Sequence, residues 1–134
     1  MYRIKHIILL FLMAAMMVAG CASDEEKKRI HFEKGKVYFE KGEFKSARIE
    51  LKNAIKIDPK YIEAHLKLAE TNLKLGNARE AYRAYLNVVE LEPNNTDAQL
   101  KLATFLMLGN QIEDSRKRVE TVLANDPNNT EALL

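Results

Sequence analysis

The chain has 134 residues, 47% of them hydrophobic and 30% charged, with 21 basic residues against 19 acidic ones. This hydrophobic content suffices for a buried core and excludes wholesale disorder, while a net charge of +2 is too small to indicate nucleic acid as a partner. The single Cys excludes an intramolecular disulfide framework and a structural zinc site built from cysteines.

Residues 1–20 are predicted to be a signal peptide. They carry Arg3 and Lys5 but no acidic residue, and an apolar stretch of 14 residues runs from Ile7 to Gly20. A helix that spans a bilayer needs about 20 apolar residues, so this stretch is short for a membrane span and typical of a secretory signal. Without it, the chain has 19 basic and 19 acidic residues and is neutral.

The only Cys follows this segment directly, in the sequence Val18-Ala19-Gly20-Cys21. It resembles the lipobox of bacterial lipoproteins, in which small residues precede a Cys that is lipidated and becomes the mature N-terminus. The alternatives are a buried thiol in an uncleaved membrane helix and an ordinary signal that is cut elsewhere. Because Ala22 and not Asp follows the Cys, the resemblance implies attachment to the outer membrane, facing the periplasm. Residues 21–27 would then be a lipidated lead-in.

The rest of the chain carries an internal repeat of 34 residues. Its markers are three prolines 34 residues apart, each preceded by a glycine turn about half a repeat earlier: Pro59, Pro93 and Pro127 after Gly42, Gly76 and Gly109. Between these markers, apolar residues recur three and four positions apart, which is the helical period. Each unit is therefore predicted to be a helix A, a glycine-capped turn, a helix B and a proline turn. Glycine accepts the left-handed conformation that ends a helix, and proline disfavours helix in the residue before it.

These units resemble the tetratricopeptide repeat. In the first, residues 28–61, the family's positions are filled by Gly35, Tyr38, Gly42, Phe44, Ala47, Leu51, Ala54 and Pro59. The second, residues 62–95, matches at Leu68, Ala69, Gly76, Ala81, Tyr85 and Pro93. The third, residues 96–129, keeps Leu102, Ala103 and Pro127 but has Ser115 in place of a tightly packed Ala. The family's usual Trp is replaced by His31, His65 and Gln99.

The resemblance implies an all-α fold, an α-solenoid of antiparallel helix pairs wound as a right-handed superhelix. It would hold three repeat units and, in residues 130–134, the start of a fourth. Because solenoids usually end on a polar capping helix and this sequence ends on two leucines, we expect a truncated part of a longer array. The alternative is that helix B of the third unit stays uncovered.

The first helix is predicted to begin just after the lipidation site. Ser23 to Glu26 match the S-x-x-E capping box, and Asp24 and Glu25 are placed to pair with residues four positions later. So short a tether would hold the solenoid against the membrane. The cations nearest to it are candidates for contact with anionic head groups, the alternative being a plain solvated face: Lys27, Lys28, Arg29, Lys34 and Lys36.

Catalytic and metal-binding patterns are missing from the sequence. It holds no P-loop, no H-E-x-x-H and no defensible Ser/His/Asp order. His31 and His65 are a possible metal pair, but they occupy the same position in successive repeats, which faces the partner helix, so packing roles are favoured. We expect a protein that is not an enzyme, with no metal, no other cofactor, no small-molecule substrate and no nucleic acid partner.

In this family helix A lines the concave wall, so the resemblance places a binding surface there. Its apolar positions, seven residues apart on each helix A, are Phe32, Phe39, Leu66, Leu73, Leu100 and Met107. Its polar positions run from basic to acidic along the array: Arg29, Lys36, Glu63, Glu70, Asp97 and Thr104. The alternative is that the apolar residues pack between neighbouring helices A. The basic clamp with which some co-chaperone members hold peptide C-termini is absent, so we expect an apolar or amphipathic segment of a partner protein.

These features predict a membrane-tethered periplasmic scaffold that helps to assemble an envelope system. Lipoproteins with these repeats serve in exopolysaccharide export, pilus biogenesis and outer-membrane protein insertion. The phrase Phe32-Glu33-Lys34-Gly35, with residues 49–54, looks most like the repeat lipoproteins linked to exosortase and exopolysaccharide export. The alternative function is an adaptor or regulator of a cell-wall enzyme.

Overall fold

The computed structural model describes residues 23–133, so the predicted signal peptide (residues 1–20) and the predicted lipidation site, Cys21, lie outside the described residues. Within that range all regular structure is helical. The helices form consecutive pairs, α2 (Asp24–Glu40) with α3 (Phe44–Ile57), α4 (Ile62–Lys74) with α5 (Ala78–Leu91), and α6 (Thr96–Leu108) with α7 (Ile112–Asn125), followed by the short α8 (Thr130–Leu133). No described helix combines the length and the apolar character needed to cross a bilayer.

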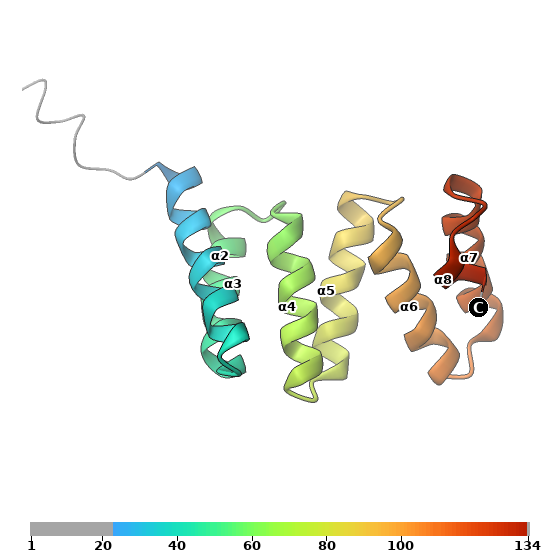
Figure 1. The fold of residues 1–134 in the computed structure, drawn as a ribbon, viewed down its shortest axis with the longest axis horizontal. Coiled ribbons are helices and arrows are strands. Elements are labelled where there is room, and N and C mark those ends of the chain that lie inside the picture. The colour runs from blue at the N-terminus through green and yellow to red at the C-terminus, as the bar shows by residue number, and fades with distance from the viewer. Residues whose placement is uncertain (1–22, 134) are drawn as a thin grey trace, which may run out of the picture.

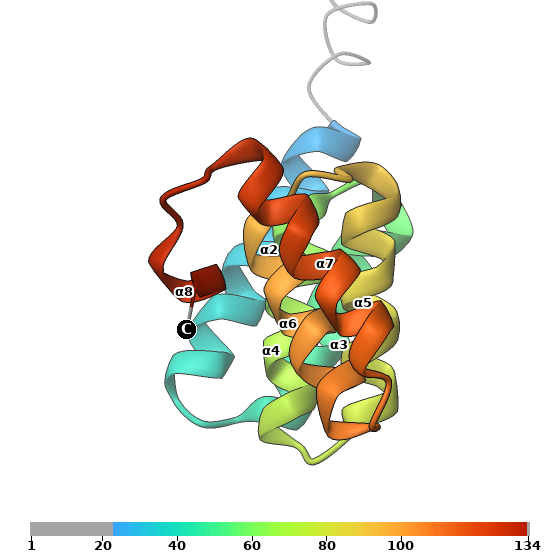
Figure 2. The ribbon, with the colours of Figure 1, turned by 90° about the vertical axis from the view of Figure 1, so that its right-hand side faces the viewer.

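The pairs stack side by side along the long axis of the molecule, as predicted for an α-solenoid (Figure 1). Seen from the C-terminal end, the helices A (α2, α4 and α6) form one layer and the helices B (α3, α5 and α7) the other (Figure 2). Each helix B also packs against the helix A of the following pair, α3 on α4 and α5 on α6. The short α8 lies on the side of the helices A.

The turns between helix A and helix B require one residue in the left-handed conformation. Gly42 (φ 76°) and Gly76 (φ 74°) supply it in the first two pairs, as predicted. In the third pair the prediction for Gly109 is wrong, because Gly109 caps α6 with φ −83° and Asn110 takes the left-handed place with φ 59°. Among residues other than glycine, asparagine tolerates this conformation well.

At the start of α2, one of the two hydrogen bonds of the predicted capping box is present. The Ser23 hydroxyl accepts a hydrogen bond from the backbone N–H of Glu26 at 3.2 Å. The expected pairs four residues apart are replaced by pairs three residues apart, which also share one helix face: Lys27 with Asp24 at 3.3 Å and Lys28 with Glu25 at 2.8 Å.

Two asparagines of the repeated Pro-Asn-Asn-Thr sequence cap the following helices. The Asn95 side chain accepts from the Ala98 N–H at 3.1 Å, and Asn129 accepts from the Ala132 N–H at 3.0 Å. Such caps satisfy backbone N–H groups that the first helical turn leaves unpaired. The second cap explains why residues 130–133 already form the first turn of a fourth helix A.

Within each pair the two helices approach closely at small residues. A Cβ atom added to Gly35 would lie 2.8 Å from Leu51 Cγ, so glycine is required where α2 meets α3. The same position holds the buried residues Ala69 and Ala103 in the next pairs. Ser115, which departs from the family pattern, is accommodated because its hydroxyl donates to the Ala103 carbonyl at 2.8 Å.

Between pairs, polar side chains hydrogen-bond across the proline turns. His65 Nε2 donates to the Pro59 carbonyl at 2.9 Å, and Gln99 Nε2 donates to the Pro93 carbonyl at 2.6 Å. These residues stand where the family usually has Trp, and here they join each helix A to the turn before it. Both bonds therefore fix the position of a proline turn against the helix A that follows it.

We expect Gly35→Val to destabilise the protein by about 2 kcal/mol, because the added methyl groups overpack the contact with Leu51. Thermal unfolding followed by circular dichroism measures the change. Lys34→Val is the control, since it places the same side chain at an exposed position of the same helix. Equal melting temperatures for the two variants would contradict the close approach of α2 and α3.

A second prediction concerns Asp58, in the turn between α3 and α4. Its carboxylate accepts from Lys28 Nζ at 2.6 Å and from the Lys60 N–H at 3.0 Å, and these bonds, the first above all, hold the pKa of Asp58 below its usual range. A lowered carboxyl pKa stabilises the fold above the pKa of the unfolded chain, about 4, and this stabilisation is lost as the pH falls through the folded-state pKa.

Asp58→Asn should therefore lower the melting temperature at pH 7, and its difference from the wild type should disappear as the pH falls through the lowered pKa of Asp58. Asp114→Asn, which removes an exposed ion pair with Lys117 inside one helix, is the control and should change little. A difference for Asp58→Asn that stays constant from pH 7 to the acid limit would refute the role of the pair.

Candidate protein-binding surface

The apolar residues predicted for the concave wall divide into three groups by exposure. Phe32, Phe39 and Leu66 are half-buried, whereas Leu73 and Met107 expose 42% and 56% of their surface. Leu100 is only 6% exposed, so it offers little surface to a partner. Leu73 and Met107 are the apolar side chains that the surface offers most openly, and they occupy the same position on α4 and α6.

The two phenylalanines of α2 contact other aromatic residues. Phe32 lies 5.0 Å from Tyr61, ring centre to ring centre, and Phe39 lies 5.3 Å from Phe44. Both rings are thus partly used by the fold, and Tyr61 joins a surface for which sequence reasoning had not selected it. Its position directly before α4, two residues after Pro59, is the signal that could have found it.

Cationic side chains lie over these rings. Three ammonium groups stand 4.8–5.5 Å from ring centres, at distances where cation–π attraction operates: Lys28 over Tyr61, Lys36 over Phe32 and Lys67 over Phe39. The first half of the surface is therefore a layer of aromatic rings covered by flexible cations.

The second half of the surface carries acidic groups from three successive helices A. Desolvation raises the pKa of the Asp97 carboxyl; Lys101 lowers it, while Glu70 and Glu131 add to the upward shift. Glu63 is exposed, and Glu70 forms an ion pair with Lys67. The Thr104 hydroxyl donates a hydrogen bond to the Leu100 carbonyl.

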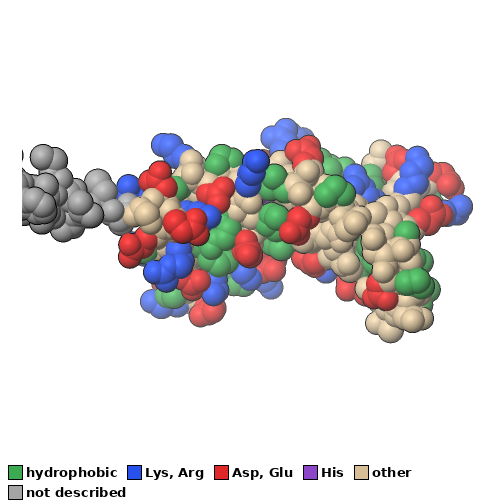
Figure 3. Space-filling view, turned by 90° about the horizontal axis from the view of Figure 1, so that it is seen from above, with side chains coloured by type: hydrophobic (Ala, Val, Ile, Leu, Met, Phe, Trp, Pro, Cys, Tyr) green, Lys and Arg blue, Asp and Glu red, His purple; other side chains and the backbone are tan. Residues whose placement is uncertain are grey.

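Leu100, Thr104 and Met107 share a recess of about 200 Å³ beside α8. Its other walls come from Ala103 on α6, from α7 and from α8: Ser115, Val119, Glu131 and Ala132. Figure 3, which views the molecule from above, shows the surface indented next to the projecting C-terminal end. The remaining predicted residues do not line this recess, and Arg29 lies in a different one on the outer side of α2.

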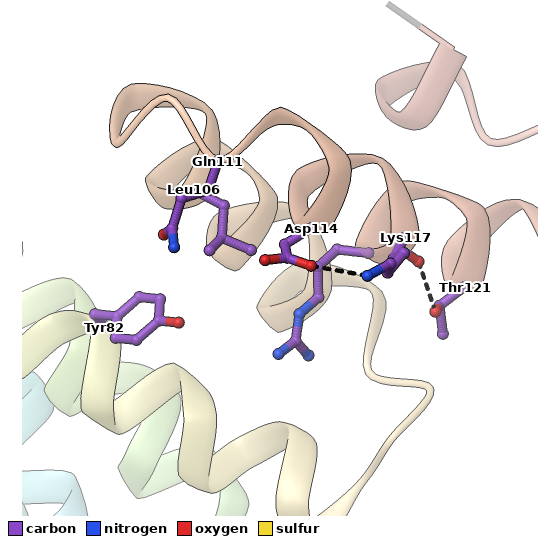
Figure 4. A pocket seen from close by; sticks show the side chains of 7 residues that line it. Tyr82, Leu106, Gln111, Asp114, Lys117 and Thr121 are labelled. Atoms are coloured by element: carbon purple, nitrogen blue, oxygen red, sulfur yellow. Dashed lines mark hydrogen bonds and ion pairs between the residues drawn. The ribbon is translucent and has the colours of Figure 1, made fainter.

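A recess of about 420 Å³ lies elsewhere, between α5 and the third helix pair (Figure 4). Tyr82 faces Gln111, Asp114 and Arg118 across it, and Asp114 pairs with Lys117 at 2.9 Å. None of the residues predicted for partner binding lines this recess.

The two histidines considered as a metal pair have separate partners. His31 Nδ1 donates to the Glu50 carboxylate at 2.6 Å, and the buried His65 bonds to the Pro59 carbonyl. In the part of the chain that the structure describes, no group of three or more His, Cys, Asp or Glu residues is placed to hold a metal ion.

Solved structures similar to this chain are repeat proteins. The first TPR of Spaghetti (RPAP3) bound to an HSP90 peptide is 25% identical, over 80% of this chain and 85% of that one, with a TM-score of 0.70. The Arabidopsis OM64 TPR domain is 18% identical over 83% and 92%, with a TM-score of 0.72. A MamA structure is 22% identical over 81% and 59%, with a TM-score of 0.73, so this chain spans under two thirds of MamA. No curated protein matches the sequence.

Two family descriptions match the sequence, and together they cover residues 35–134. The one described as TPR repeat matches residues 35–76, and the one described as tetratricopeptide repeat matches residues 72–134. The helix pairs, the left-handed turns and the small residues at the helix contacts agree with both. The chain is a member of the tetratricopeptide repeat family.

Proposed function

We propose that this protein is a membrane-anchored periplasmic scaffold that binds an amphipathic segment of a partner protein along its helices A and thereby helps to assemble an envelope system. The observation that carries the proposal is the pair Leu73 and Met107, two exposed apolar side chains at the same position on neighbouring helices. Apolar side chains that stay in contact with water do not stabilise the protein, whereas a partner that lies across α4 and α6 would bury both.

The charges beside these residues define the chemistry of the partner. The cations over the aromatic rings at the α2 end are already paired with carboxylates of this chain, Lys28 with Glu25 and Asp58 and Lys36 with Glu33. Glu63 on α4 and Asp97 on α6 are exposed and form no ion pair within residues 23–133. Complementary charge fixes orientation and suppresses wrong partners. The segment would therefore carry apolar anchors with basic residues toward α4 and α6.

A similar structure supports binding of a short segment. The RPAP3 repeat domain, at 25% identity, is bound to the HSP90 peptide SRMEEVD. For the present chain, we extend this to a segment recognised through side chains, because the basic clamp for a peptide C-terminus is missing from its helices A.

The proposed anchor is Cys21, acylated after removal of residues 1–20. Several acyl chains on one residue give durable attachment, since each buried CH₂ contributes about 0.8 kcal/mol and a single chain is marginal. Asp24, three residues later, begins α2, so an acylated chain would hold the start of α2 close to the membrane surface.

We expect Leu73→Glu combined with Met107→Glu to abolish capture of the partner without unfolding the protein. Both side chains are exposed, so charges there cost little stability but cannot be buried in an apolar contact. Pull-down from cells that express a tagged full chain, with circular dichroism of each variant, measures the two effects separately.

The matched control is Ile49→Glu. Ile49 is as exposed as Met107, at 59%, but lies on helix B of the first pair, so this variant should capture the partner like the wild type. Undiminished capture by the Leu73→Glu, Met107→Glu variant would refute the proposed surface.

A separate prediction tests the anchor. Replacement of Cys21 by Ser should abolish incorporation of labelled palmitate in a bacterial host, and the protein should leave the outer-membrane fraction, because the acylated thiol is gone. Intact-mass measurement of the wild-type protein should give a chain that begins at an acylated Cys21. A wild-type chain of unmodified mass would overturn the anchor while leaving the binding surface untouched.

A further inference from the structure

Among residues 23–133, α2 is the helix A that has no preceding pair against its outer face. Ile30, Lys34 and Val37 lie along this face, three or four residues apart. Ile30 is 40% exposed and Val37 47%. At the equivalent positions of the next pairs, buried side chains pack against the preceding helix B: Ala64, Leu68 and Thr71 on α4, and Ala98 and Leu102 on α6.

This face forms a recess of about 470 Å³ whose apolar centre is bordered by cations. Ile30, Val37 and Tyr38 line it together with Arg29, Lys34 and Lys41. Among residues 23–133, none of these three cations forms an ion pair, whereas Lys27, Lys28 and Lys36 pair with carboxylates. Glu33 and Glu50 also line the recess, but they are paired with Lys36 and His31.

The five cations predicted as candidates for membrane contact thus fall into two groups, paired and unpaired. Lys27, Lys28 and Lys36 are neutralised by partners, while Arg29 and Lys34 stay unpaired in the described part of the chain and are joined by Lys41. Unpaired cations beside exposed aliphatic side chains and a half-buried tyrosine are the combination that favours an anionic lipid interface.

We propose that this face of α2 docks on the anionic phospholipid surface of the membrane to which the N-terminus is attached. The membrane then takes the place that a preceding repeat would occupy. The inference rests on the membrane attachment proposed above. The N-terminal sequence is the reason for choosing lipid as the occupant of this face. Cys21, the proposed acylated residue, lies three residues before Asp24, the first residue of α2, so the start of α2 would lie close to the bilayer.

Docking in this way would fix the orientation of the whole solenoid. With α2 lying flat on the membrane, the pairs α4–α5 and α6–α7 stack away from it along the long axis seen in Figure 1. The surface around Leu73 and Met107 then faces along the membrane plane, at a fixed distance from the lipid, and binds its partner at that distance.

The test measures the distance of α2 from lipid head groups in the acylated full chain, reconstituted into vesicles of phosphatidylethanolamine with phosphatidylglycerol. A fluorescent probe is attached to Glu40→Cys, at the far end of α2, and quenched by lipids with nitroxide head groups. A helix that stood upright would hold this residue about 24 Å farther from the lipid than Asp24. Lys74→Cys, the same position one repeat later, is the matched control.

We expect strong quenching at residue 40 and weak quenching at residue 74, because neighbouring helices are about 10 Å apart. Lys34→Glu with Lys41→Glu should lower the docking equilibrium at least about ten-fold, so quenching at residue 40 is lost. Lys52→Glu with Lys56→Glu, an equal charge change on exposed residues of α3, should leave quenching intact.

The outcomes separate the two proposals. Failure of the wild-type protein to float with vesicles overturns the anchor. Flotation with equal, weak quenching at residues 40 and 74 overturns the docking of α2 alone. Quenching at residue 40 that persists in phosphatidylcholine vesicles or in the charge-reversed variant also overturns the proposal, as does a dimer in sedimentation that the charge reversal dissociates, since the face would then bind a second copy.

Discussion

The close contact between the two helices of each pair is the constraint on which the rest of the structure depends. A Cβ atom added to Gly35 would lie 2.8 Å from Leu51 Cγ on α3, and the small residues Ala69 and Ala103 are buried at the same position of the next pairs. Because each pair buries only part of its apolar surface, it must stack on the next pair to form a core. The helices A are thereby held in one layer at a fixed spacing, and any surface built from them inherits a regular order of side chains.

Most of this arrangement could be predicted because the signals repeat. Three prolines 34 residues apart and the glycine turns between them define the helix ends, and one error at a single turn does not disturb the others. That error, Gly109 for Asn110, arose because the glycine of the third pair stands one residue early: the left-handed residues Gly42, Gly76 and Asn110 keep the 34-residue spacing. The family pattern predicts where the turn lies but not which of the two residues adopts the left-handed conformation.

The candidate surface was harder to predict, since position in a repeat does not determine exposure. Leu100 and Leu66 hold equivalent positions, yet Leu100 is buried and lines a recess beside α8, while Leu66 is half-buried. Phe39 meets Phe44 and Lys67, contacts that depend on three helices at once. The pairing of Lys28 likewise depends on Asp58, which lies in the turn before α4 and is brought near by folding. These distinctions are tertiary and became available only with the structure.

The central claim of the account is that a partner binds across the helices A around Leu73 and Met107. Site-specific photocrosslinking in living cells tests it most directly, with the photoreactive residue placed at position 73, at position 107 and, for comparison, at Ile49 on the opposite layer. The account predicts that positions 73 and 107 trap the same protein, identified by mass spectrometry, and that position 49 does not. Crosslinks to that protein from position 49 alone, or different proteins trapped at 73 and 107, would contradict it.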